Sequence, residues 1–217
     1  MRRAGLSLTA LLLLPVVAAA QNGGFVAGSR DLFVLDLASV PVDEFPKQLM
    51  LLKGDVRVVQ KFGKPMLRAS DQAQLLIEFA DELPQDFTLE FDLVPKLNCN
   101  PEDLSFEGTA EIDQGPSSMN VLWQSTHVGL VGGAEQNKEI PLPEDLTVKA
   151  RGNLTEVRAS FTGTTFRLYT NGKEIVNESG RKFVRGRLLR VGLGGQDERM
   201  CSVHLAKLRV ATNSPRP

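Results

Sequence analysis

Two acidic residues near the middle of the chain have the spacing of a glycoside-cleaving strand. In Glu111-Ile112-Asp113 the carboxylates are two residues apart, and alternate residues of a β-strand share one face. Retaining hydrolysis needs two carboxyl groups about 5–5.5 Å apart, one of which protonates the leaving oxygen. The next position on that face is Gly115, and Pro116 follows it. The sequence therefore carries only half of such a pair, and we expect no enzyme activity from it.

Other catalytic and metal-binding patterns are weaker. His127 and His204 are the two histidines, and neither has a Cys or a second His at metal-ligand spacing. No Gly-x-Ser-x-Gly nucleophile elbow is present. We expect structural or surface roles for both histidines.

Three side chains are candidates for ligand binding: Trp123, Glu90 and Asp92. An outward Trp123 would be a stacking platform for a sugar and an inward one would be core, and its alternation with Val121 favours the core. Glu90 and Asp92 lie on the polar side of the Phe87–Leu93 run, where they are the only carboxylate pair we can nominate for another hydrolase. The same spacing is also that of a solvated strand face.

Two polar segments could hold a hard cation. Asn100 and Asp103 follow Cys99, and Asp197 precedes Cys201. If the two cysteines are bridged, these segments become neighbours, and their oxygen ligands suit calcium. The alternative is the ordinary polar composition of turns. We expect no other cofactor.

The first 20 residues predict an export signal. Arg2 and Arg3 precede an apolar run that ends in Ala18-Ala19-Ala20, and the run is shorter than a bilayer span. We therefore expect a signal peptide over 1–20, a linker over 21–30, one domain over 31–210 and a disordered tail over 211–217. The protein is then periplasmic or extracellular, with no transmembrane segment after cleavage.

Charge argues against a nucleic-acid partner. The chain has 25 basic and 26 acidic residues, and removal of Arg2 and Arg3 leaves 23 basic residues and a formal charge of −3. A basic cluster from Arg181 to Arg190 is better explained as a solvated face.

Cys99 and Cys201 are the two cysteines, and an exported pair tends to close into a disulfide. The chain-entropy relation gives about 4–5 kcal/mol for a loop of about 100 residues. The alternative is two buried thiols.

Short alternating segments separated by Gly, Pro, Asn or Asp predict an all-β protein. The clearest are Phe87–Val94 and Thr155–Val176, in which Asn171-Gly172 forms a two-residue hairpin turn. We expect fourteen strands, at Leu32–Leu37, Val56–Gln60, Pro65–Ala69, Ala73–Phe79, Phe87–Val94, Ser105–Ile112, Asn120–Gln124, Val128–Val131, Leu146–Ala150, Thr155–Thr162, Thr165–Thr170, Lys173–Val176, Leu188–Leu193 and Val203–Val210. Such spacing is typical of a sandwich or barrel, and a short helical turn is an alternative near Pro101–Leu104 or Pro143–Leu146.

The entry strand Leu83–Leu93, the hairpin Val157–Lys173 and the closing Leu208-Arg209-Val210 resemble the concanavalin A-like lectin and glucanase superfamily. That resemblance implies a two-sheet antiparallel jelly-roll β-sandwich, shared by laminin G-like modules and family 16 glycoside hydrolases. Glu111 and Asp113 match part of the family 16 Glu-x-Asp-x-(x)-Glu strand, whose acid/base Glu is missing here.

Leu32–Leu37, Phe45-Pro46 and Lys64–Arg68 also resemble the exported sandwich that precedes peptidoglycan-binding domains in some bacterial outer-membrane-protein-A-like proteins. No such domain follows here, so wall anchoring is not implied.

These observations predict an exported, non-catalytic binding module for a carbohydrate such as a polysaccharide, or for another envelope component. One alternative is a protein–protein scaffold of the cell envelope, which would expose aliphatic side chains. Another is a glycoside hydrolase-like enzyme of the same fold.

Overall fold

The structure is a computed structural model that describes residues 24–95, 103–110, 112, 119–132, 137–150, 152–194 and 202–214. The side chains of 148–150 are outside this description.

Thirteen strands and one short helix make up the described part of the chain. In order they are β1 (Arg30–Val34), β2 (Met50–Lys61), β3 (Lys64–Glu78), β4 (Phe87–Val94), β5 (Leu104–Thr109), β6 (Asn120–Trp123), β7 (His127–Val131), β8 (Lys138–Pro141), α1 (Glu144–Ala150), β9 (Thr155–Thr162), β10 (Thr165–Thr170), β11 (Lys173–Ser179), β12 (Leu188–Leu193) and β13 (Val203–Thr212). The expected all-β class is confirmed.

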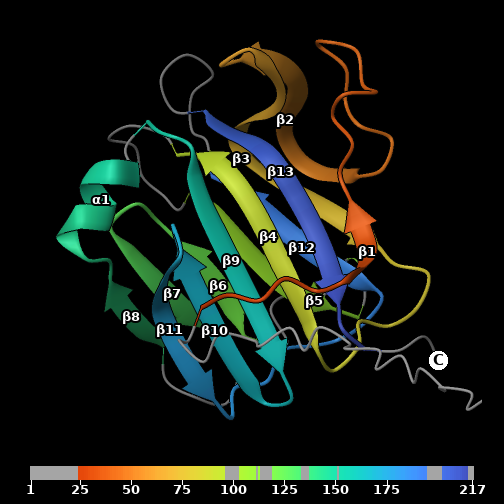
Figure 1. Cartoon of the computed structure of the whole chain (residues 1–217). Coiled ribbons are helices and arrows are strands. Elements are labelled where there is room, and N and C mark those ends of the chain that lie inside the picture. Colours follow the sequence, from red (N-terminus) through yellow and green to blue (C-terminus); the bar gives the residue numbers. More distant parts are fainter. Residues whose placement is uncertain are drawn as a thin grey trace, which may run out of the picture.

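The strands form two layers. The front layer has the order β11-β10-β9-β4-β13-β1, and the back layer has the order β2-β3-β12-β5-β6-β7-β8 (Figure 1). Strand β13 joins the layers, because it pairs with β4 along most of its length and with β3 through Val203–Leu205. All pairs are antiparallel. The molecule is therefore an antiparallel β-sandwich, as predicted.

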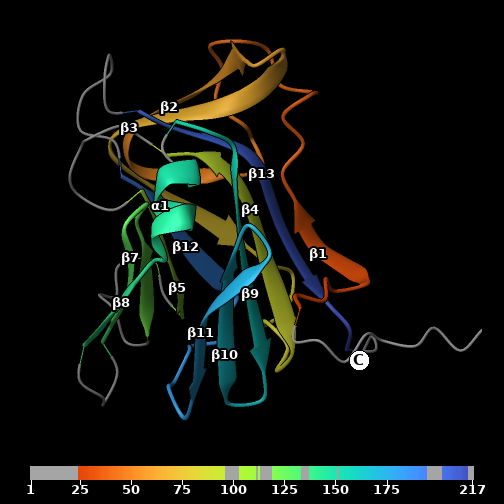
Figure 2. The same ribbon diagram turned by 60° about the vertical axis from the view of Figure 1, so that its left-hand side comes forward.

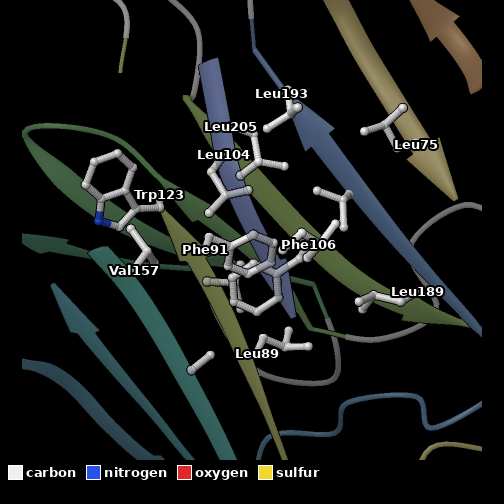
Figure 3. Packing of buried hydrophobic residues seen from close by; sticks show 14 of the residues in the cluster. Leu75, Leu89, Phe91, Leu104, Phe106, Trp123, Val157, Leu189, Leu193 and Leu205 are labelled. Carbon is white, nitrogen blue, oxygen red and sulfur yellow. The ribbon is translucent and has the colours of Figure 1, made fainter. Parts of the chain in front are cut away.

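The core lies between the layers. Alternate residues of β4 point inward, and Phe91 stacks on Phe106 of β5 with ring centroids 5.5 Å apart (Figure 3). A second aromatic group, which includes Phe87 and Phe161 at a centroid distance of 4.4 Å, fills one end. At about 25 cal/mol per Å² of apolar area removed from water, such rings dominate the stabilisation of a sandwich.

The predicted strand at Leu146–Ala150 is wrong, because this segment is helix α1. Pro143 precedes the helix, its carbonyl accepts from the amides of Leu146 and Thr147, and two carboxylates occupy the first turn. Proline and acidic residues favour a helix start strongly enough to outweigh β propensity. Figure 2 shows α1 at the side of the sandwich. Strand β8 was not predicted.

Two predicted strands, Pro65–Ala69 and Ala73–Phe79, are one strand, β3. Asp71 and Gln72 have positive φ values of 57° and 53°, opposite Gly54 of β2 with φ of 91°. The pairing of β2 with β3 shifts register between Lys53 and Asp55. The gap between the two predicted strands is a bulge that bends the β2–β3 pair, and β3 continues through it.

Both ends of the domain extend further than predicted. Residues 24–29, expected as linker, cross the front layer toward β1 (Figure 1), and the Gly28 amide donates to Thr88 Oγ1 at 3.1 Å. Ala211 and Thr212, expected in a disordered tail, are the buried end of β13 and pair with β1. Within the described residues, no helix is long and apolar enough to cross a membrane.

Candidate functional site

The outer side of the front layer carries polar side chains in register across neighbouring strands. One row runs from Arg167 of β10 to Ser160 of β9 and Thr88 of β4. The next row joins Tyr169, Arg158 and Glu90. Because the inward positions of these strands form the core, their outward positions are left for charge and hydrogen bonding.

Glu90 lies at the centre of an ion network on this face. Its carboxylate accepts from Lys207 Nζ at 2.6 Å and from Arg209, while Arg158 Nε lies 3.7 Å away. Although charged, the residue is only 5% exposed. The partners come from β13 and β9 on either side of β4, so the network ties three strands together.

The pKa of Glu90 follows from these contacts. Burial raises it, but the hydrogen bonds and charges of Lys207 and Arg209 outweigh burial and leave the pKa below the ordinary value of 4.5. A general acid for glycoside cleavage needs the opposite shift, toward the working pH. The local electrostatics therefore suit a carboxylate that is ionised at neutral pH.

Asp92 is held in the same network. Its Oδ1 atom accepts from Arg158 Nη2 at 2.5 Å, and Arg158 Nη1 also donates to the Phe91 carbonyl. Glu90 and Asp92, which the sequence nominated as a pair, do share a face and share Arg158. Both carboxylates are engaged by cations of the protein.

A hollow of about 170 Å³ lies beside this network. Its lining residues come from the start of β4, from β9 and β10, from the crossing segment 24–29 and from Asn213. Its lining offers one guanidinium, one carboxylate, one amide and several hydroxyls over aromatic residues, from Gly24, Val26, Asp86, Phe87, Thr88, Ser160, Phe161, Thr162, Arg167, Tyr169 and Asn213.

Several polar groups of the hollow already have partners. The Asp86 Oδ1 atom accepts from the Gly163 amide at 2.9 Å, and Asn213 Oδ1 accepts from the Ser29 amide at 2.9 Å. Arg167 is exposed and forms no ion pair with another described residue within 4.0 Å. A guanidinium has five N–H donors, so Arg167 keeps donor capacity for a ligand beside its hydrogen bond with the Tyr169 phenol.

Tyr169 forms the aromatic part of the hollow. Burial raises the pKa of its phenol, a hydrogen bond with Glu174 raises it further, and Arg167 opposes both effects. The Phe25 ring meets the tyrosine ring edge-on at a centroid distance of 5.8 Å. The crossing segment thus covers one side of Tyr169 and leaves the hollow beside it.

Trp123 is a core residue. Its side chain is 0% exposed, and its indole Nε1 donates to Thr170 Oγ1 of β10 at 3.0 Å. Figure 3 shows the ring between the layers near Val157. The inward orientation that alternation favoured is correct, and the candidate role of Trp123 as an exposed sugar platform is corrected, because no ring face reaches the surface.

Asp103 joins three loops at the upper end of the sandwich. It is 3% exposed, its Oδ2 atom accepts from the Ser125 amide at 3.2 Å, and its carbonyl accepts from the Gly194 amide at 3.2 Å. The segments near 103 and 194 are therefore adjacent. Asn100 and Asp197, its other proposed ligands, lie outside the described residues, as do Cys99, Cys201, Glu111 and Asp113.

Among the described residues no group of three metal-ligating side chains is present. A smaller hollow of about 130 Å³ lies next to Gly194 and is lined mainly by amides, Ser105 and glycines. Its Gln72 already accepts from Lys53 at 3.3 Å.

Sequence reasoning missed the groups that build the larger hollow. Arg167 and Ser160 were assigned to the Thr155–Thr170 hairpin, and their outward alternation could have grouped them with Thr88. The contribution of segment 24–29 to the hollow could not have been found from alternation, since Phe25 and Val26 show no strand periodicity.

Comparison with known proteins shows the fold. No family model and no curated protein matches the chain. The binding domain of Paraclostridial Mosquitocidal Protein 1 matches with a TM-score of 0.59 and 12% identity, over 86% of this chain and 50% of that one. The ligand-binding domain of botulinum neurotoxin serotype D, solved with N-acetylneuraminic acid, matches with a TM-score of 0.58 and 10% identity, over 86% and 48%.

A carbohydrate esterase of Shiga toxin-encoding bacteriophage phi24B matches with a TM-score of 0.51 and 9% identity, over 77% of this chain and 91% of that one. A sialidase matches with a TM-score of 0.52 and 11% identity, over 77% of this chain and 17% of its own. The chain thus spans about half of the toxin binding domains and a small part of the sialidase. At these identities the likeness shows a β-sandwich fold, and the finer resemblance to one superfamily stays a prediction.

Proposed function

We propose that the protein is a non-catalytic binding module of the cell exterior or envelope, whose ligand is a carbohydrate held on the outer side of the front layer. The observation that carries this proposal is the hollow between segment 24–29 and strands β4, β9 and β10. It combines hydroxyl, amide, carboxylate and guanidinium groups, and its aromatic residues are buried beneath them. Such a polar lining suits sugars through the hydroxyls at their edges.

Arg167 defines the expected ligand more closely. Its guanidinium has five donors in a fixed plane and prefers carboxylates and hydroxyl pairs. It faces the hollow from β10, beside Ser160 and Tyr169. We expect an acidic polysaccharide or an acidic terminal sugar to bind better than a neutral one. The ligand class is supported by structures of similar fold, which include a carbohydrate esterase and a toxin domain solved with N-acetylneuraminic acid.

The ion network supports the absence of catalysis in this proposal. Glu90 has a pKa below its ordinary value and Asp92 is bound by Arg158. A proton donor requires a raised pKa, which is the opposite of the shift at Glu90, and the Asp92 carboxylate is engaged by Arg158. In this proposal, Glu90 and Asp92 join β4, β9 and β13 beside the hollow.

A glycan array covering neutral and acidic polysaccharides tests the proposal, with wild-type protein beside Ser160→Phe and Glu156→Phe. Both substitutions place a ring on the outer face of β9, but only Ser160 lines the hollow. We expect binding by wild type and Glu156→Phe and loss in Ser160→Phe. Silence of the wild-type protein across the array would refute carbohydrate binding.

A second function is favoured by a separate observation. Five of the exposed apolar residues lie close together in sequence near the start of the domain, at Val26, Val34, Val42, Met50 and Leu51, while Ile112 and Leu154 lie elsewhere. A protein–protein scaffold would use such a surface. An array without signal, together with self-association or capture of one envelope protein that Val34→Ser and Leu51→Ser abolish, would support this alternative.

A further inference from the structure

The tip of the β2–β3 hairpin breaks a local rule of turn chemistry. Strand partners Lys61 and Lys64 enclose Phe62-Gly63, whose φ values are 53° and 72°. Two successive positive values define a type I′ turn, in which Asn, Asp or Gly is favoured at the first position. A large aromatic residue there is a backbone outlier.

The same molecule contains the favoured version of this turn. Asn171-Gly172 has φ values of 48° and 79°, and the Asn171 Oδ1 atom accepts from the Glu156 amide at 2.9 Å. The comparison shows that the fold does not require phenylalanine at such a corner. Phe62 must therefore be explained by something other than the turn.

Packing within the protein does not explain Phe62 either. Its side chain is 66% exposed, and a methyl group added at Gly63 would meet no atom within 4 Å. The hairpin stands at the top of both views, beyond the upper ends of β4 and β9 (Figures 1 and 2). The ring is thus exposed on a projecting corner, at a cost in backbone strain, and Lys61 is the group that lies over it.

Two lysines flank the ring. Lys61 Nζ lies 5.6 Å from the Phe62 ring centroid and 3.3 Å from His204 Nδ1. Neither Lys61 nor Lys64 forms an ion pair with a carboxylate of the described residues. Burial and the charges of Lys61 and Arg68 lower the pKa of His204 to about 4, so this histidine adds no proton at neutral pH. The corner is cationic through its lysines.

We propose that this corner is a membrane-contact site: Phe62 enters the interfacial layer of an anionic phospholipid surface while Lys61 and Lys64 bind its phosphate groups. A single projecting ring between two cations matches the layered chemistry of such a surface, in which phosphates lie above an apolar interior. A protein partner would need a pocket for the ring and carboxylates for both lysines. A lipid surface offers an apolar interior for the ring and phosphate groups for both lysines anywhere along its plane.

Phe62→Asn separates binding from folding. Asn is the favoured residue at this position, so the variant is expected to keep or raise the midpoint of urea unfolding. Sedimentation with vesicles of equal parts phosphatidylcholine and phosphatidylglycerol is expected to show partitioning at least about tenfold weaker than wild type, because the apolar contact is lost. Lys61→Gln and Lys64→Gln are each expected to weaken it about fivefold.

Leu154→Asn is the matched control, since Leu154 is also a partly exposed apolar residue, at 41%, and is not part of the β2–β3 hairpin. It should bind vesicles as the wild type does. A Phe62→Trp variant adds a second reporter, because the natural tryptophan is fully buried. Its fluorescence should shift to the blue with the anionic vesicles and remain unchanged with pure phosphatidylcholine.

Three results would overturn the proposal. They are absence of wild-type binding to the anionic vesicles, equal binding to phosphatidylcholine alone, and undiminished binding by Phe62→Asn. The first result would leave the corner to a protein partner. The site does not depend on the carbohydrate hollow, so Ser160→Phe should bind vesicles normally and each proposal can fail alone.

Discussion

Glu90 shows how a carboxylate on a strand face can be used for cohesion between strands. Lys207 and Arg209 approach it from β13, and Arg158 approaches from β9. Removing the carboxylate would leave these three cations close together without the negative charge of Glu90 to balance them. Deleting one partner of a buried ion network is costly for this reason, even where the whole network adds little net stability.

Glu90→Gln is expected to lower the free energy of unfolding by about 3 kcal/mol in urea denaturation at pH 7. Glu156→Gln, on the same face but with a side chain that is 56% exposed, should change it by less than about 0.5 kcal/mol.

Because the folded-state pKa of Glu90 is lowered, its stabilisation exists above the unfolded pKa and is lost as pH falls through the folded value. The difference between wild type and Glu90→Gln should therefore shrink below pH 4.5. Equal stabilities of the two proteins at pH 7 would contradict the network's role.

His204 predicts a second dependence on pH. Its folded-state pKa is lowered from 6.5 to about 4, first by burial and then by Lys61 and Arg68. A base with a lowered folded pKa takes up its proton preferentially in the unfolded chain, so stability falls as pH decreases from 6.5 toward 4. His204→Gln should remove this part of the slope in urea titrations across that window. An unchanged slope would show that His204 does not carry it.

For single residues, the sequence predicted which side of a strand a residue lies on better than it predicted which partners that residue contacts. Alternation placed Glu90 and Asp92 on one polar face and favoured Trp123 inside, and the structure agrees on both points. It could not show that Arg158, far away in the chain, would engage both carboxylates. Such pairing depends on strand order, which local periodicity does not encode.

The β2–β3 hairpin carries the main irregularity among the elements. Gly54 has a φ of 91°, and a Cβ atom there would lie 2.6 Å from Ala73 Cα across the bulge. Gly63 at the corner also has a positive φ, but the space around it is open. A side chain at Gly63 would therefore meet backbone strain alone, whereas one at Gly54 would meet backbone strain and close packing.

Gly63→Ala is expected to cost about 1–2 kcal/mol, which is the strain of a side chain at positive φ. Gly54→Ala should cost about 2 kcal/mol more, because neighbouring backbone must also move. Thermal or urea unfolding of the two variants checks the order. Equal losses would mean that the bulge accommodates a methyl group.

At the element scale, regular strands were predictable and irregular ones were not. The bounds of Phe87–Val94, Thr155–Thr162, Thr165–Thr170 and Leu188–Leu193 match the structure. Leu, Thr and Val in Leu146–Ala150 favour a strand, but the segment Glu144–Ala150 is a helix because the Pro143 start signal and two acidic residues outweigh their β propensity. The bulge at Asp71-Gln72 appeared in sequence as a gap between strands.

For the molecule as a whole, the layered fold followed from strand spacing, while the path of segment 24–29 over the front layer did not. That segment shapes the hollow through Gly24 and Val26. Its contacts to Thr88 and Asn213 join residues far apart in the chain. A short apolar stretch next to a predicted leader contains no periodic signal for such a path.

The proposed Cys99–Cys201 bridge belongs to this scale. Val94, the last residue of β4, pairs with His204 near the start of β13, so the segments that contain the cysteines leave from neighbouring strand positions. Reduction of the mature protein should lower its free energy of unfolding by about 4 kcal/mol. Two alkylatable thiols in the unreduced protein would show that the bridge is absent.

The central claim is that the hollow on the front layer binds a carbohydrate through Arg167. Calorimetric titration of the strongest array ligand into wild type, Arg167→Gln and Lys182→Gln tests it most directly, because Lys182 is an exposed cation outside the residues that line the hollow. We predict that Arg167→Gln weakens binding at least about tenfold, as expected for the loss of a charge-assisted contact. We also predict that Lys182→Gln binds like wild type. Equal affinities of Arg167→Gln and wild-type protein would contradict the account.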